Sequence, residues 1–170
     1  MRKVIVERMR KIKQATPTIE KKLKVKIVFK KDSINLKGPE PEEFLAEQIV
    51  RAVDFGFKIN EAMLLTNPDF ILEFIDIKDF TPRKNLKDVR ARLIGKKGKA
   101  KKTIENLTGA NIVIKGNSVG VIVGSEHLNY VTQAIESLIH GAKHGNVFAY
   151  LEHQNARQKK FDRDDLGLKS

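Results

Sequence analysis

Apolar and polar residues follow the same order in two parts of the chain. Residues 27–29 and residues 112–114 are short apolar runs, and each is followed by a turn and a second strand-like run. The turn of the later copy is Gly116-Asn117, a pair that is typical of a two-residue β-hairpin. The earlier copy turns at residues 31–32. Matching positions stand a constant 85 residues apart, so the pattern predicts a repeated structural unit.

Helical periodicity surrounds each predicted hairpin. A basic helical segment precedes the hairpin, and an amphipathic helix follows it. The later amphipathic helix has an apolar face with spacings of three and four, which consists of Leu128, Val131, Ile135, Leu138 and Ala142. Pro41 opens the earlier one, whose apolar face consists of Leu45, Ile49 and Val53.

A break at residues 67–69, Asn-Pro-Asp, separates the two copies. The strand-like run 70–77 follows it, so the second copy has the order strand, helix, helix, strand, strand, helix. We therefore expect an α+β fold of two modules, residues 1–68 and residues 69–170, the second with a C-terminal helical tail. In each module, a three-stranded antiparallel sheet covered by three helices would bury the apolar residues.

Composition limits the classes of protein. A hydrophobic content of 41% is enough for packed cores, and no apolar run approaches the roughly 20 residues that span a bilayer. The absence of cysteine excludes disulfides, thiol catalysis and cysteine-based zinc sites. We expect a soluble, cytoplasmic protein that makes no contact with a membrane.

The net charge of +12 is concentrated in two blocks. Residues 1–31 carry twelve Lys and Arg against two acids, and residues 83–102 carry ten against one. The intervening residues 32–82 carry four against eleven. Two basic blocks indicate two contact areas for a polyanion; solvated faces or an acidic partner protein would explain them as well.

A basic loop with two glycines lies between the first two predicted helices of the second module. Gly95 and Gly98 allow positive φ and leave room for an approaching backbone. The helix that follows ends at about Thr108, before a left-handed Gly109, and its N-terminus favours anions. The loop therefore predicts a phosphate-binding site, in which Lys96, Lys97 and Lys99 supply positive charge. Its glycine spacing fits neither a P-loop nor a dinucleotide-binding loop.

The candidates for catalysis and metal binding are weak. His140 and His144 share a helix face with His153 downstream, but further ligands would have to be carboxylates, so exposed histidines are the better interpretation. The aspartates at 162, 164 and 165 lie among basic residues near the C-terminus, as in a solvated tail. No nucleophile with its base is visible. We expect no cofactor, no metal and no enzymatic activity.

Residues 94–98, Ile-Gly-Lys-Lys-Gly, followed by Ile104, residues 108–110 and Ile112, resemble the core of a KH domain, here of type I. In that family the loop clamps about four single-stranded nucleotides. The resemblance implies an RNA-binding site made of Arg90, Arg92, Leu93, Ile94, Gly95, Lys96, Lys97, Gly98, Lys99, Lys101, Lys102 and Ile112. Lys101 stands where many KH domains have an aliphatic residue, which favours backbone contact over base recognition.

The first module lacks the clamp. Residues 11–17, Lys-Ile-Lys-Gln-Ala-Thr-Pro, stand in its place without a glycine. Basic residues remain around them, namely Arg8, Arg10, Lys11, Lys13, Lys21, Lys22, Lys24 and Lys26. Three interpretations stay open: non-specific phosphate contact, protein docking that also uses the acidic residues 40–47, and a solvated helix.

A degenerate first KH module before an intact second one is similar to the Pno/Dim family of small-subunit ribosome biogenesis factors, in its archaeal form. The similarity includes residues 49–57, 61–65 and 72–77 and the segment that starts at Gly145. It implies binding of single-stranded RNA at the 3′ end of small-subunit rRNA and presentation of that site to the endonuclease Nob. It also implies contact with the α subunit of translation initiation factor two. The alternative function is a scaffold that links rRNA processing to this factor and binds RNA non-specifically.

Overall fold

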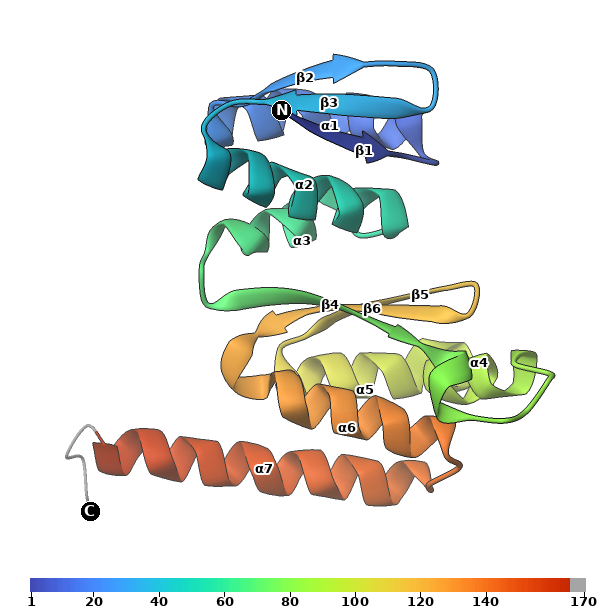
Figure 1. Cartoon of the computed structure of the whole chain (residues 1–170). Helices are drawn as coiled ribbons and strands as arrows, with labels where there is room; N and C mark the ends of the chain where they lie inside the picture. The colour runs from blue at the N-terminus through green and yellow to red at the C-terminus, as the bar shows by residue number, and fades with distance from the viewer. Residues whose placement is uncertain (166–170) are drawn as a thin grey trace. The chain divides into compact units, whose positions relative to one another are not determined.

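The computed structural model describes residues 1–165 and divides the chain into two compact units, Met1–Leu72 and Glu73–Ser170 (Figure 1). The division falls inside strand β4 (Phe70–Asp76), whereas the sequence predicted a boundary after residue 68. No helix of the described residues is long and apolar enough to cross a membrane. Each unit contains a three-stranded antiparallel sheet, as expected for an α+β fold with KH-type domains.

The first unit has the order β1 (Arg2–Ile5), α1 (Met9–Leu23), β2 (Lys26–Phe29), β3 (Ser33–Lys37) and α2 (Glu40–Phe55). A short helix α3 (Ile59–Ala62) and a 3-10 turn η1 (Met63–Thr66) follow and pack on α2. In the sheet, β3 lies between β1 and β2 and is antiparallel to both. The predicted turn at residues 31–32 joins β2 to β3, and the helix predicted to open at Pro41 is α2, which begins one residue earlier at Glu40.

Between its first two strands, the first unit has one helix instead of the two helices and the loop of the KH pattern. A single 15-residue helix, α1, connects β1 to β2, and it runs through residues 11–17, which contain no glycine. Its buried residues Ile12, Ala15, Ile19 and Leu23 keep a spacing of three or four across Pro17. One continuous apolar stripe against the sheet therefore replaces two helices and a loop.

The second unit has the predicted order strand, helix, helix, strand, strand, helix. After β4 and the 3-10 turn η2 (Ile77–Phe80) come α4 (Lys87–Ile94), the turn η3 (Lys96–Gly98) and α5 (Lys99–Thr108). The hairpin of β5 (Asn111–Lys115) and β6 (Ser118–Gly124) turns at Gly116-Asn117, and β6 lies between β4 and β5. The turn η4 (Ser125–His127), α6 (Leu128–Ile139) and α7 (His144–Asp165) complete the unit.

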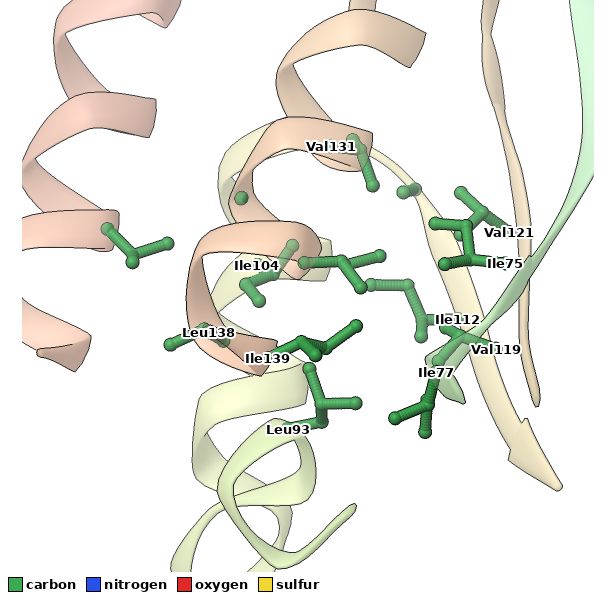
Figure 2. Close-up of a cluster of buried hydrophobic side chains, with 14 of the residues drawn as sticks. Ile75, Ile77, Leu93, Ile104, Ile112, Val119, Val121, Val131, Leu138 and Ile139 are labelled. Atoms are coloured by element: carbon green, nitrogen blue, oxygen red, sulfur yellow. The ribbon is translucent and has the colours of Figure 1, made fainter. Parts of the chain in front are cut away.

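The core of the second unit lies between its sheet and its helices. Figure 2 shows Ile75, Ile112, Val119 and Val121 of the strands directed towards Ile104 and other side chains of the helices. Helix α7 packs on α5 and α6 through Val147 and Leu151, which are both buried. This packing holds α4 and α5 in place and so positions the loop between them.

The repeat is visible in how the helix before each hairpin ends. Gly109 caps α5 in the left-handed conformation (φ 74°), and its N–H donates to the carbonyl of Glu105 over 2.8 Å. Lys24, 85 residues earlier, caps α1 in the same conformation (φ 55°), with its N–H bonded to the carbonyl of Glu20 over 3.1 Å. The second half of α1 is thus the structural equivalent of α5.

Candidate nucleic-acid interface

The loop between α4 and α5, residues 95–99, is called the clamp loop below. Its backbone departs from helical geometry at both glycines: Gly95 has φ 76° and ψ 174°, and Gly98 has φ 75° and ψ 11°. Between them Lys97 also adopts positive φ (55°), which is uncommon for a residue with a side chain. The N–H of Gly98 donates to the carbonyl of Gly95 over 3.1 Å and closes the turn.

The two glycines are required for different reasons. A Cβ on Gly95 would stand 2.6 Å from both the Cβ and the backbone nitrogen of Ala100, so only glycine fits. A Cβ on Gly98 would meet nothing within 4 Å. Gly95 therefore allows the close packing of α4 against α5, whereas Gly98 leaves open space at the surface. An incoming backbone could occupy that space.

Positive charge surrounds this open position. Lys96, Lys97 and Lys99 are exposed, and their ammonium groups have no hydrogen-bond or ion-pair partner among the residues the structure describes. Lys99 is also the first residue of α5, whose N-terminal turn carries the positive end of the helix dipole. No acidic residue occupies that turn. The site is therefore suited to phosphate oxygens.

Of the neighbouring side chains with a predicted RNA contact, three lie near the surface. Ile94 is 39% exposed, and Lys102 is exposed on α5. Lys101 is half-buried and pairs with Glu105 over 3.1 Å, while the other carboxylate oxygen of Glu105 accepts the N–H of Ile112. Lys101 consequently carries less free charge than the lysines of the clamp loop.

The remaining four predicted contact residues serve the fold. Leu93 and Ile112 are buried in the core of the second unit, at 3% and 4% exposure. The guanidinium of Arg90 donates to the side chain of Asn117 over 2.8 Å and so ties α4 to the β5–β6 turn.

The guanidinium of Arg92 donates to the carbonyl of Leu138 in the last turn of α6 and to the carbonyl of Ala142, which lies between α6 and α7. The bonds of Arg90 and Arg92 thus hold α4 in position.

Two of the histidines make contacts within the second unit. Nε2 of His144 lies 2.8 Å from the carbonyl oxygen of Arg92, and the ring of His140 lies edge-on to Phe80. The described residues contain no group of three or more His, Asp or Glu side chains that could hold a metal ion. His144 thus joins the start of α7 to α4, a role that its spacing from His140 did not indicate.

One residue of the site was missed by sequence reasoning. Ala100, buried at 4% exposure, is the residue against which Gly95 packs. The signal for it is a small residue directly after the basic run, five positions beyond Gly95. A larger side chain there would separate α4 from α5 and open the clamp loop.

In the first unit, the basic residues of α1 lie beside a small hollow. Arg8 and Lys11 line it together with Lys58, and its volume is about 260 Å³. Val53 and Phe57 contribute apolar surface to it. The hollow offers charge but no glycine loop, in agreement with the predicted loss of the clamp.

The comparisons with known proteins agree with this geometry. A family model for the second KH domain of PNO1-type proteins, described as a eukaryotic type KH domain (KH-domain type I), matches residues 71–156. A KH domain-containing protein of Methanocaldococcus jannaschii is 34% identical over 150 residues, which cover 84% of this chain and 66% of that protein. The pre-rRNA-processing protein PNO1 of Coccidioides immitis is 31% identical over 116 residues, which cover 66% of this chain and 46% of that protein.

A solved structure is similar over most of the chain. The a/eIF2alpha–aDim2p–rRNA complex from Pyrococcus horikoshii contains a chain that matches with a TM-score of 0.82 at 28% identity. The match covers 92% of this chain and 94% of that one. In contrast, the chain spans no more than about two thirds of the length of the curated relatives it matches. By the KH-domain model and these relatives, the chain belongs to the Pno/Dim family of KH-domain proteins, as the sequence predicted.

Proposed function

We propose that the second unit binds single-stranded RNA through the clamp loop, at the 3′ end of small-subunit rRNA during maturation of the small ribosomal subunit. The observation that carries this proposal is the open space at Gly98, which lies at the N-terminus of α5 between unpaired lysines. An RNA backbone needs close approach and neutralising charge, and this position offers both.

The chemistry of the site favours backbone binding over base recognition. Lys96 and Lys97 would neutralise phosphates on one side of Gly98, and Lys99 on the other. Ile94 is the exposed apolar side chain beside the clamp loop, so it would contact the nearest base. The protein holds the RNA in an extended form and cleaves nothing itself.

The names of the relatives support the choice of rRNA. One is a pre-rRNA-processing protein, and the similar solved structure is a complex of aDim2p with rRNA. Presentation of the bound strand to the endonuclease Nob follows from the family resemblance. A strand held by its phosphates leaves its bases and the next scissile bond accessible to a second protein.

Binding of a labelled single strand that matches the 3′ end of small-subunit rRNA tests the proposal, with a scrambled strand of equal length as the control. We expect preference for the rRNA strand. If three or four phosphates are contacted, log K should fall with log salt at a slope of roughly −2 to −3. Equal binding of both strands would place the specificity in a partner.

Two double variants separate charge from structure. Lys96→Asp with Lys97→Asp should weaken binding by at least about tenfold, because repulsion replaces attraction at two phosphates. Lys96→Asn with Lys97→Asn has nearly the same shape, and asparagine tolerates positive φ at position 97, so this variant should lose less affinity. Unchanged affinity in the aspartate variant would exclude the clamp loop as the site.

A second candidate function is a scaffold that links rRNA processing to the α subunit of initiation factor two. It is favoured by the similar solved structure, in which a/eIF2alpha is present together with aDim2p and rRNA. The aspartate variant of the clamp loop distinguishes the two functions. A scaffold retains the initiation factor in a pull-down when RNA binding is lost.

A further inference from the structure

The sheet of the first unit has an outer face that is rich in lysine. The pairing of its strands places Lys3 beside Asn35 and Val28 in one row, and Lys26 beside Lys37 in another. Ile5 pairs with Ser33, and Lys30 continues β2 through a bond from its N–H to the carbonyl of Ser33. The outer face thus consists of Lys3, Ile5, Lys26, Val28, Lys30, Ser33, Asn35 and Lys37.

This face is opposite to the core of its unit. The neighbours of these residues along the strands, such as Val4, Ile34 and Leu36, are buried, because successive side chains of a strand point to opposite sides. All four lysines of the outer face are exposed, and Ile5 is 77% exposed. The side chains of these lysines make no hydrogen bond or ion pair within the described part of the chain.

Two of these positions have a different character in the second unit, whereas Val28, Lys30 and Ser33 correspond to the identical residues Val113, Lys115 and Ser118. Lys37 corresponds to Ile122, which is fully buried, and Asn35 corresponds to the buried Gly120. The repeat has therefore kept the sheet but changed the chemistry at these two positions of its outer face. The sheet therefore forms with an apolar side chain in place of Lys37, so the fold does not require a lysine at this position.

A shallow hollow lies at the hairpin end of this face. Its volume is about 500 Å³, and it is lined by Lys3, Ile5, Lys30, Lys31, Asp32 and Ser33. Three ammonium groups against one carboxylate give the hollow a positive charge. A phosphate group could be contacted from both edges of the sheet, because the outer strands are only about 10 Å apart.

We propose that the outer face of the first sheet binds the phosphate backbone of helical RNA. The face carries no aromatic side chain, and single-strand binding without a clamp relies on base stacking against such side chains. A helical RNA instead presents regularly spaced phosphates on a rigid surface and is recognised by its shape. Lysine is depleted at protein–protein interfaces but makes phosphate contacts readily, which favours RNA over an acidic protein.

This site is separate from the clamp loop, and its test uses a different RNA. The ligand is a blunt duplex of about 16 base pairs, which has no single-stranded segment. The sheet variant carries Lys3→Gln, Lys30→Gln and Lys37→Gln. The matched control carries Lys143→Gln, Lys159→Gln and Lys160→Gln, which remove the same charge from exposed positions elsewhere.

We expect the sheet variant to bind the duplex at least about tenfold more weakly than the unmodified chain, and the slope of log K against log salt to fall in magnitude by roughly 2 to 3. The control should change affinity less than about twofold. Equal losses in the two variants would show an effect of net charge alone and would overturn the proposal. So would an unchanged affinity in the sheet variant.

The clamp variant with Lys96→Asp and Lys97→Asp separates this inference from the proposed function. It should lose the single strand and keep the duplex, whereas the sheet variant should do the reverse. If the clamp variant lost the duplex and the sheet variant kept it, the duplex would bind at the second unit. That result would overturn the present proposal and leave the proposed function intact.

Discussion

Glu105 on α5 accepts a hydrogen bond from the backbone N–H of Ile112 on β5 over 3.1 Å. Glu20 on α1 accepts the equivalent bond from Ile27 on β2 over 2.9 Å. In each unit, one carboxylate therefore joins the last turns of a helix to the first strand of the hairpin that follows. Glu20 and Glu105 stand 85 residues apart, so the same bond is made at matching positions of the repeat.

Loss of the Glu105 carboxylate should destabilise the second unit. Glu105→Ala leaves the N–H of the buried Ile112 without a partner, which costs about 1 to 3 kcal/mol. Glu105→Gln keeps an acceptor oxygen and should cost less. Urea unfolding measures both, and equal stability of the alanine variant and the unmodified chain would contradict this role.

Substitutions at the C-terminal caps of α1 and α5 should change the free energy of unfolding in opposite directions. Lys24 holds a left-handed conformation that costs a residue with a side chain about 1 kcal/mol, so Lys24→Gly should raise the free energy of unfolding by up to that amount. Gly109→Ala should lower it by about 1 to 2 kcal/mol. A Cβ at Gly109 would meet nothing within 4 Å, so the effect reports backbone conformation alone. Thermal unfolding of the two variants tests the pair.

The two glycines of the clamp loop should differ in stability and in RNA binding. Gly95→Ala brings a methyl group against Ala100 and should cost about 3 kcal/mol from overpacking and positive φ together. Gly98→Ala should cost only about 1 kcal/mol, but its methyl group occupies the space proposed for the RNA backbone. We expect the first variant to unfold more easily and the second to stay folded with weakened RNA binding. The reverse order of stability would show that the packing against Ala100 is unimportant.

Arg92 should act on stability more than on RNA. Its guanidinium donates to the carbonyls of Leu138 and Ala142, and bonds of this charged kind contribute about 1.5 to 3 kcal/mol. Arg92→Gln should lower the free energy of unfolding by that amount. The exposed Arg83 provides a control, Arg83→Gln, that removes the same charge. If folded Arg92→Gln lost much RNA affinity and Arg83→Gln did not, that result would support the direct RNA contact that the sequence predicted for Arg92.

Glu43 should make the first unit sensitive to acid. Burial favours its neutral form. The hydrogen bond and charge of the Met1 amino group, the N–H of Gly38 and the charge of Arg2 favour the carboxylate more strongly, and together they lower the pKa of Glu43. The unfolded chain therefore takes up this proton first as the pH falls. The contribution to stability is complete above the ordinary glutamate pKa and is lost as the pH falls through the lower folded value.

Unfolding measured between about pH 7 and pH 3 checks this expectation. Glu43→Gln should be less stable than the unmodified chain at neutral pH, and the difference should shrink below the ordinary glutamate pKa. Glu152→Gln, at an exposed position of α7, is the control and should leave the pH profile unchanged. A constant difference at all pH values would exclude ionisation of Glu43 as the cause.

Local signals in the sequence predicted much of the second unit. Gly116-Asn117 forms the expected hairpin turn, and Gly109 adopts the expected left-handed cap. Such features depend on one or two residues and their own backbone preferences. The RNA contacts of the clamp loop stay predictions, but their geometric basis, positive φ at Gly95 and Gly98, is present in the structure.

Long-range packing was harder to predict. Arg92 and Leu93 look alike in sequence as neighbours of a basic loop, but one is bonded to α6 and the other is buried in the core. Only the packing of α4 against α6 decides this. In the first unit, Pro17 lies inside α1, and the apolar stripe from Ile12 to Leu23 continues across it. That stripe was the stronger signal, because burial of a whole helix face outweighs one lost backbone bond.

The continuous helix α1 has a consequence for the history of the repeat. In the second unit, a loop and a separate helix, α4, stand between β4 and α5, whereas β1 and α1 are joined directly by residues 6–8. Glycines placed at Arg10 and Lys13, the equivalents of Gly95 and Gly98, would weaken α1 without creating a clamp, because no chain is available to form the preceding helix. The two modules therefore differ by an insertion or a deletion. Single substitutions cannot convert the function of one module into that of the other.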